Sequence, residues 1–428
     1  MIKNGFISYI VKYIAAVSLF TVLLFASALI PRKTLASNML TSAEFLCNKE
    51  MFGYIWEGVD ASIYDRYADS ILLNIAWNYE SDNPVRSVVE SSFYHTDSQG
   101  ENLNFYDAVT SDLDANLEYV RYWHGSISVV RPLLVIMPIQ DMYIFLAVIL
   151  LILFLTLIWR LRSLDEKALI VAVTLGMMLT YSWFVPFSLE YIWTYLITLV
   201  VSHLIINKDI NDSKYISILM ITGILTAYMD FLTTETLTLT IPLMISIKIR
   251  GKNDDRLIAL KSAIAWGIGY VGMFIFKWLL ASIILGGSIK DHVLGHVEER
   301  VGGVILDEAY FGTLGPIWKN ISTMIPFSLG RCGVIAGILI ILICIYMGYI
   351  YHGKTVKTNT VVIYAVCGLI PLVRFLTLRN HSVIHYFFTF RALMATVMAI
   401  VMIMTEVFDM KLFRDNWRIV RGKRRCVK

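Results

Sequence analysis

Long apolar runs alternate with short polar segments along most of the chain. A membrane-spanning helix needs about 20 mostly apolar residues. Ten runs approach this length, near residues 8–30, 142–159, 168–186, 192–206, 215–229, 237–249, 263–287, 332–351, 361–377 and 388–407. The fifth and sixth are short, and such spans often border irregular backbone that lines a cavity. The pattern predicts an all-α integral membrane protein, a polytopic bundle of about ten transmembrane helices.

One polar stretch, residues 32–141, is much longer than the others. It contains the segment Ala61–Trp77, in which apolar residues recur at helical spacing. We therefore expect a large, partly helical first loop with amphipathic helices. The predicted parts are a first transmembrane helix (1–31), this extracytoplasmic loop (32–141), a bundle of nine spans with an outer loop at 288–331 (142–410), and a basic cytoplasmic tail (411–428). A cleaved signal peptide is the alternative for the first part, although its apolar run is long for one.

The composition agrees with a membrane protein and excludes other classes. The chain has 428 residues, of which 57% are hydrophobic and 16% charged, whereas soluble domains have roughly 45–50% apolar and about 25% charged residues. A soluble enzyme, a disordered chain and a nucleic-acid-binding protein are excluded. The five cysteines show no CxxC spacing, so neither a disulfide framework nor a zinc site is implied. Neither glycine-rich nucleotide-binding fingerprint is present.

The charges are sorted along the chain. Of the 37 lysines and arginines, 22 fall in alternate short segments and in the tail, whereas residues 34–130 contain 15 acidic and 4 basic residues. Because cytoplasmic loops carry the excess of lysine and arginine, we predict a multi-pass plasma (inner) membrane protein with both termini cytoplasmic and an extracytoplasmic active face. The basic tail serves as a topology anchor or contacts anionic lipid.

Carboxylates concentrate at the predicted outer face. Asp65 and Asp69 are four residues apart, so both project from one face of a helix, with Asp60 just before it. Such a pair suits general-base chemistry or a divalent cation, and a solvated helix face is the alternative. Asp230 and Glu235 lie in the outer turn between the two short runs, where they either face a polar cavity or cap a helix.

Basic side chains also gather at this face. They are Arg121, His124, Arg131, Arg374, Arg379, His381, His385 and Arg391. Arginine and histidine at headgroup depth suit a phosphate or diphosphate group, although the aromatic residues beside Arg121 also fit an interfacial belt. His381 and His385 are four apart, but no HExxH glutamate accompanies them. Lys277 inside the seventh run and Glu190 before the fourth are further polar residues without an assigned role.

This layout resembles the GT-C class of integral-membrane glycosyltransferases, which have many spans, a large first outer loop and acidic residues in that loop. The nearest counterpart of the class motif is Tyr64–Ser70 (YDRYADS), which lies further from the first span than usual. The segments Arg121–Gly125 and Asn380–Ser382 also resemble parts of bacterial surface-polysaccharide membrane proteins. The resemblance implies a sugar donor linked to polyprenyl phosphate, a glycan or lipid acceptor, and a role in cell-envelope glycan assembly.

The resemblance also implies roles for the candidate residues. Asp65 or Asp69 would deprotonate the acceptor hydroxyl, and the arginines and histidines would neutralise the departing phosphate. Asp230 and Glu235 would position hydroxyl groups. No cofactor is required, and a divalent cation is compatible with this chemistry. A lipid-linked glycan polymerase or ligase is one alternative, and a non-enzymatic transporter or flippase is another.

Overall fold

The structure is a computed structural model that describes residues 2–207, 209–251, 255–287, 314–325, 330–352 and 356–425. The described part contains 19 α-helices. Ten of them form the long helices of the bundle: α1 (Ile2–Ala28), α7 (Ile139–Ser163), α8 (Lys167–Leu179), α9 (Ile192–Ile205), α10 (Asp212–Met229), α11 (Leu237–Arg250), α12 (Asp255–Ile284), α16 (Gly330–Ile350), α17 (Thr358–Thr377) and α20 (Met394–Val407).

The remaining elements are shorter. The first loop forms α2 (Arg32–Cys47), β1 (Phe52–Tyr54), η1 (Asp60–Ser62), β2 (Ile63–Asp65), α3 (Arg66–Asn78), α4 (Pro84–Glu90), α5 (Glu101–Thr110) and α6 (Ile127–Leu134). The bundle adds η2 (Ser182–Phe187), α15 (Gly315–Met324), α18 (Arg379–Ile384), α19 (Tyr386–Thr389), η3 (Phe390–Leu393) and the terminal α21 (Met410–Arg425).

Five helical segments are long and apolar enough to cross a membrane. They are Ile7–Ala28, Ile139–Ser163, Arg256–Ile284, Thr358–Thr377 and Tyr386–Val407. Shorter apolar helices accompany them at Lys167–Leu179, Ile192–Ile205 and Gly337–Ile350. The chain is therefore an almost entirely helical protein of the multi-pass membrane type, which confirms the predicted fold class at this level.

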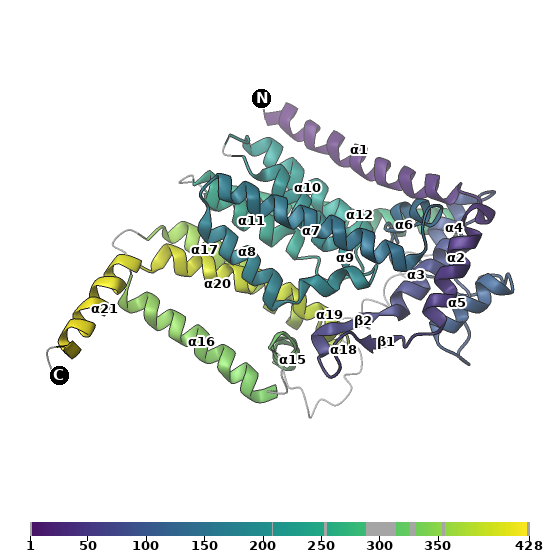
Figure 1. The fold of residues 1–428 in the computed structure, drawn as a ribbon. Helices are drawn as coiled ribbons and strands as arrows, with labels where there is room; N and C mark the ends of the chain where they lie inside the picture. Colours follow the sequence, from purple (N-terminus) through teal and green to yellow (C-terminus); the bar gives the residue numbers. More distant parts are fainter. Residues whose placement is uncertain are drawn as a thin grey trace.

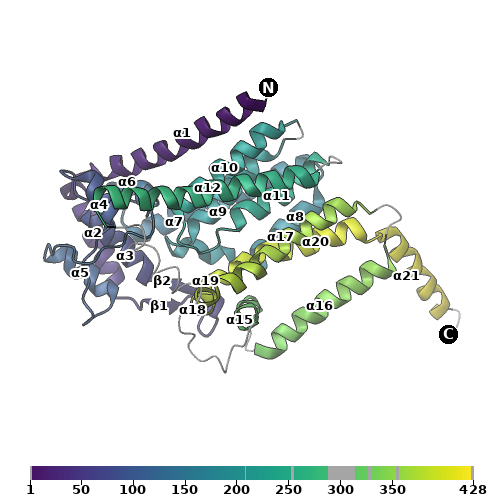
Figure 2. The same ribbon diagram turned by 180° about the vertical axis from the view of Figure 1, so that it is seen from behind.

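The helices run side by side along one long axis, and the first-loop elements α2–α5 gather at one end of the bundle (Figure 1). Both chain termini lie toward the opposite end, as the reverse view also shows (Figure 2). The turns after η2, α10 and α17 return to the end that carries the first loop. We call this end the loop end, because the functional candidates come together there.

The helices α10 and α12 approach each other closely because glycines face the contact. A Cβ atom on Gly223 would lie 2.0 Å from the Trp266 carbonyl oxygen, and one on Gly269 would lie 2.2 Å from that of Met220. Small residues allow such close helix packing in membranes, where apolar burial gives no net drive for association. This contact fixes the position of the α10 carboxyl end, which borders the candidate site.

Two predicted elements differ from the structure. Ala61–Trp77 was expected to be one helix, but Ile63–Asp65 pairs as a strand with Phe52–Tyr54 and the helix begins only at Arg66. The run 168–186 was expected to be one span, but α8 ends at Leu179 and a 3-10 helix follows Tyr181, whose φ is 52°. Most of the predicted outer loop at 288–331 and residues 426–428 of the tail lie outside the described residues.

Candidate functional site

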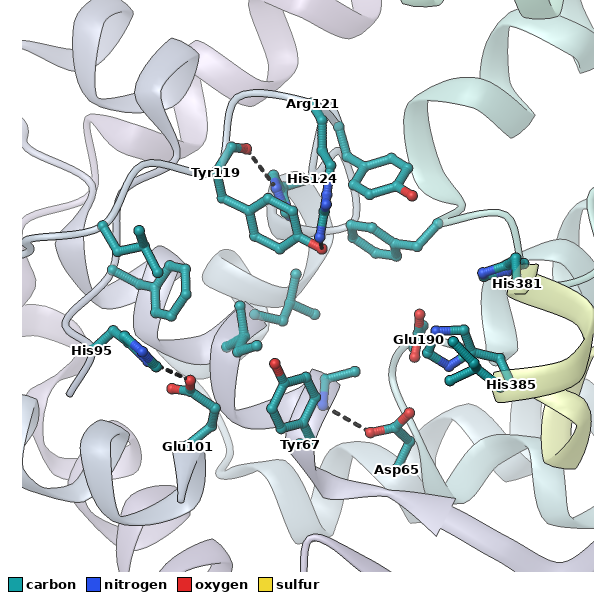
Figure 3. A pocket seen from close by; sticks show the side chains of 18 of the residues that line it. Asp65, Tyr67, His95, Glu101, Tyr119, Arg121, His124, Glu190, His381 and His385 are labelled. Atoms are coloured by element: carbon teal, nitrogen blue, oxygen red, sulfur yellow. Dashed lines mark hydrogen bonds and ion pairs between the residues drawn. The ribbon is translucent and has the colours of Figure 1, made fainter. Parts of the chain in front are cut away.

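A cavity of about 630 Å³ lies at the loop end, between the first loop and three turns of the bundle. Figure 3 shows its central side chains converging from these separate segments. The first loop contributes one wall, which includes Asp65, Tyr67, Glu101, Tyr119, Arg121 and His124. The bundle contributes the other wall, which includes Glu190, Phe231, His381, His385 and Phe388. Of the predicted site residues, the structure thus brings together Asp65, Arg121, His124, His381 and His385.

Asp65 is placed by the junction between β2 and α3. Its backbone pairs with Phe52 across the hairpin, and its Oδ1 accepts a hydrogen bond of 2.8 Å from the Ala68 amide. Asp65 therefore caps α3. The prediction that it shares a helix face with Asp69 is wrong, because the helix begins only after Asp65. Burial raises the pKa of Asp65 to about 7, against the lowering effect of the Ala68 amide. A carboxyl group with such a pKa can take up a proton near neutral pH.

Glu190 is the partner of Asp65 across the cavity. The two carboxyl groups lie close enough to interact electrostatically and both line the cavity (Figure 3). Burial, followed by the charges of Asp65, Asp230 and Asp69, raises the pKa of Glu190 well above its usual range. Because two adjacent carboxylates cannot easily both ionise, Glu190 holds a proton where Asp65 releases one. The sequence alone indicates no role for Glu190, because its approach to Asp65 depends on packing between distant segments.

The segment Arg121–Gly125 is held against α10 and α12. Trp123 donates from Nε1 to the Met273 carbonyl at 2.8 Å, and it is fully buried, so it is not an interfacial-belt residue. The Gly125 amide donates to the Tyr228 carbonyl at 2.9 Å, where a Cβ atom would be 2.3 Å from that oxygen. These contacts hold the segment that carries the cavity-lining side chains of Arg121, Tyr122 and His124.

His124 is a neutral side chain in this environment. Its Nε2 donates to the Tyr119 carbonyl at 3.2 Å, which leaves Nδ1 as a hydrogen-bond acceptor, and Nδ1 has no partner among the residues that the structure describes. Burial, followed by the charges of Lys277 and Arg121, lowers the pKa of His124 to about 3 despite the bond to Tyr119. An unprotonated Nδ1 accepts hydrogen bonds from a donor such as a hydroxyl group, so the role of His124 in neutralising a phosphate would require a protonated ring and stays a prediction.

His381 and His385 lie one helical turn apart on the bundle wall, as their spacing predicted. Their ring centroids are 4.7 Å apart. His381 donates from Nε2 to the Leu232 carbonyl at 2.9 Å, and His385 stacks on Phe388 with centroids 5.2 Å apart. Arg121 lies on the opposite wall, with its guanidinium 4.6 Å from the Tyr119 ring centroid. These three side chains supply the nitrogen groups that could contact an anion in the cavity.

Three other predicted site residues hold the fold together and do not line the cavity. The buried Asp69 carboxylate accepts from Tyr143, Ser188 and the Leu189 amide. Arg131 donates to the carbonyls of Ile30, Ala76 and Tyr79. Arg391 donates to the carbonyls of Phe387 and Ala61 at 3.0 Å. Each charged group is hydrogen-bonded to partners in the interior, as a buried charge requires.

The acidic turn between α10 and α11 is also structural. Asp230 accepts from the amide and the hydroxyl of Thr233. Glu235 forms a buried ion pair of 2.7 Å with Arg374, whose Nη2 also donates to the Leu232 carbonyl. None of these residues lines the cavity. They fix the turn that holds Phe231, which does line it, and the carbonyl to which His381 donates.

The last candidates are peripheral to the cavity. Asp60 accepts a bond of 3.3 Å from the Tyr54 hydroxyl, and Arg379 begins α18 without lining the cavity. Lys277 donates to the carbonyls of Val88 and Val89 at 3.2 and 2.8 Å, so it joins α12 to the end of α4.

The described residues contain no group of three or more His, Cys, Asp or Glu side chains placed to hold a metal ion. We therefore assign no residues as ligands of a divalent cation.

Comparison with known proteins gives no relative: no protein-family model, curated protein or solved structure matches the chain significantly. The function is therefore inferred from the cavity itself.

Proposed function

We propose that the protein is a membrane glycosyltransferase that moves a sugar from a polyprenyl-phosphate-linked donor to an extracytoplasmic acceptor. The observation that carries the proposal is the buried Asp65 carboxyl group, which lines a cavity together with Arg121, His381 and His385. A base and a set of anion-binding groups around one cavity are what transfer from a phosphate-linked sugar requires. The resemblance of the layout to GT-C transferases agrees with this proposal.

The proposed reaction is a single displacement. Asp65 takes the proton from a hydroxyl group of the acceptor. At the same time, the oxygen of that hydroxyl group forms a bond to the anomeric carbon of the sugar. The bond between that carbon and the phosphate oxygen breaks, and the phosphate leaves with the electron pair. Arg121, His385 and the imidazolium form of His381, whose Nε2 donates to the Leu232 carbonyl, bind the phosphate oxygens, which carry more negative charge as the bond breaks. Glu190 keeps its own proton and holds Asp65 in position.

An apolar groove supports a lipid-linked donor. A second hollow, of about 340 Å³, runs along α17 and is lined by Val366, Leu369, Ile370, Val373, Arg374 and Thr377. Four of these six side chains are aliphatic, which suits contact with an isoprenoid chain. Arg374 at its end shares the Leu232 carbonyl with His381, which lines the cavity. A chain in this groove would therefore approach the site from the bundle side.

The finer topology belongs to the same proposal. We infer ten membrane crossings, with both termini in the cytoplasm of a plasma (inner) membrane and the cavity at the extracytoplasmic face. The support is the sorting of basic residues into alternate segments and the placement of both termini away from the loop end (Figures 1 and 2). A donor whose phosphate lies at the outer membrane surface would meet the cavity there.

The test is transfer of labelled sugar by the full chain reconstituted in lipid nanodiscs. A panel of polyprenyl-phosphate sugars serves as donor, with extracted envelope glycan as acceptor. We expect incorporation by the wild type and by Asp114→Asn, an exposed surface control, and its loss in Asp65→Asn. No transfer from any donor by the wild type would refute the proposal. Full activity in Asp65→Asn would instead favour a polymerase or ligase that needs no carboxylate base.

A further inference from the structure

The loop wall of the cavity has a different chemistry from the bundle wall. It carries Tyr67, Phe93, His95, Glu101, Leu117 and Tyr119, all from the first loop. Figure 3 shows His95 and Glu101 on the side of the cavity away from His381 and His385, with Tyr67 between the two sides. The His95 side chain is 29% exposed and its partner Asp97 is fully exposed. This end of the cavity therefore adjoins the aqueous surface of the loop.

Glu101 is fixed in place on this wall. Its Oε1 lies 2.6 Å from His95 Nδ1, and its Oε2 accepts from Asn104 Nδ2 at 3.1 Å. A carboxylate has about four acceptor positions, so each oxygen can accept a further hydrogen bond. Glu118 lines the same wall. The carboxylates of Glu101 and Glu118 accept hydrogen bonds from hydroxyl groups and repel phosphate. The histidines of the bundle wall, in contrast, are the groups proposed to bind phosphate.

Aromatic rings surround Glu101. Phe93 lies edge-on to His95, with ring centroids 6.1 Å apart, and 6.2 Å from Tyr119. Tyr67 stacks on Phe52 at 5.7 Å and is 39% exposed. Aromatic faces carry partial negative charge, so they attract the C–H groups on the faces of a sugar ring. Aromatic rings beside a fixed hydrogen-bond acceptor are suited to a polyhydroxylated ligand.

His124 adds an independent observation. Its Nδ1 is a buried acceptor with no partner among the described residues, and the residue lines the cavity and is 2% exposed. An unpaired buried polar atom costs free energy. The backbone of His124 is also strained, because its φ of 52° is unfavourable for a residue other than glycine. Both features are typical of binding sites. A hydroxyl group donates the bond that this nitrogen lacks, whereas a phosphate oxygen cannot.

We propose that the loop wall is the binding subsite for an uncharged acceptor glycan, which enters from the aqueous side and presents one hydroxyl group to Asp65. Glu101 and His124 accept hydrogen bonds from its other hydroxyls, and Phe93 and Tyr67 contact its ring faces. This inference rests on the proposed transferase function and restricts the acceptor to uncharged glycans. It disfavours a teichoic-type polymer, because the phosphates would meet Glu101 and Glu118, while Arg121, the arginine of this wall, binds the donor phosphate in the proposed reaction.

The test measures binding and needs no donor. Saturation-transfer-difference NMR is recorded on the full chain in nanodiscs with maltohexaose and chitohexaose as neutral probes and poly(glycerol phosphate) as the anionic one. We expect a neutral probe to bind the wild type and Glu50→Gln, an exposed control. We expect affinity about tenfold lower in Glu101→Gln, as for loss of a hydrogen bond to a charged group, and a similar loss in Phe93→Ala. Thermal unfolding checks that both variants fold.

The outcomes separate the two proposals. Glu101-dependent binding of a neutral probe without sugar transfer from any donor would support the subsite and refute the transferase. Sugar transfer accompanied by equal probe binding in the wild type, Glu101→Gln and Phe93→Ala would refute the subsite and keep the transferase. Failure of both neutral probes to bind the wild type, or tighter binding of poly(glycerol phosphate), would also overturn the subsite.

Discussion

The Asp65 side chain has two roles that place opposite demands on its charge. As the cap of α3 it accepts a bond from the Ala68 amide, which a neutral side chain such as asparagine also does well. As the proposed base it must be ionised, although it is 3% exposed. A buried charge lowers the free energy of unfolding. Aspartate at position 65 therefore suits catalysis, whereas asparagine would suit stability better.

We therefore predict that Asp65→Asn lowers activity and raises stability at pH 7.5. Loss of a general base should reduce sugar transfer by about 10²–10⁴-fold. Removal of the buried charge should raise the unfolding temperature by a few degrees, at roughly 2–4 °C per kcal/mol for a domain of 150–250 residues. Initial rates and thermal unfolding in nanodiscs check both effects. The unfolding temperature should rise less in Asp65→Ala, because this variant also loses the helix cap. A lower unfolding temperature in Asp65→Asn than in the wild type would contradict this prediction.

The pH dependence follows from the same group. Burial raises the pKa of Asp65 from 3.8 to about 7, so the proposed base is ionised only above this pH, and transfer should fall as the pH drops from 8 to 6. Stability should change in the opposite direction. The folded state binds this proton more tightly than the unfolded state, so the unfolding free energy rises as the pH falls through about 7. Rates and unfolding temperatures between pH 5.5 and 8 test this, and in Asp65→Asn the pH-dependent gain in stability should shrink.

Residue type and position along the chain predicted part of the site. Asp65, Arg121, His381 and His385 do line one cavity. Asp69 and Arg391 are of the same types and nearby in sequence, yet their charges are satisfied by interior hydrogen bonds. No local pattern separates the two groups, because the distinction depends on which distant carbonyls and hydroxyls pack against each side chain.

The elements were more predictable than the residues, since long apolar runs specify helices directly. The helix expected at 192–206 is α9, and that expected at 237–249 is α11. The errors occur where a helix ends inside an apolar run. Leu179 and Val185 lie in the predicted run 168–186, but Tyr181 adopts a left-handed conformation, and apolar character does not reveal such a break. At Asp65 the strand pairing with Phe52 overrides the helical period.

Two glycines of α12 provide a matched test of its packing against α10. A Cβ atom on Gly269 would lie 2.2 Å from the Met220 carbonyl oxygen, whereas one on Gly267 meets nothing within 4 Å. We predict that Gly269→Ala lowers the unfolding temperature by several degrees because the helices must separate. Gly267→Ala should leave it unchanged or slightly higher, since alanine favours a helix by about 1 kcal/mol over glycine. Equal effects of the two substitutions would show that the close contact does not limit stability.

At the scale of the whole molecule, the position of the cavity relative to the membrane decides which substrates it can meet. All cavity-lining residues lie at the loop end, away from both termini (Figures 1 and 2). The acidic first loop and the basic segments at the other end would face opposite sides of a membrane under the positive-inside rule. In that orientation the cavity would open at the outer face, so a donor and an acceptor would both have to be present outside.

This topology predicts the labelling of single cysteines in intact cells. Starting from a variant with all five cysteines replaced by serine, Ser98→Cys in the first loop should react with a membrane-impermeant maleimide. Ser213→Cys, in the first turn of α10 at the opposite end, should react only after the membrane is permeabilised. Both positions are exposed, so a difference reports the side of the membrane and not burial. Labelling of Ser213→Cys from outside would invert the topology and place the cavity in the cytoplasm, where an extracytoplasmic acceptor could not reach Asp65.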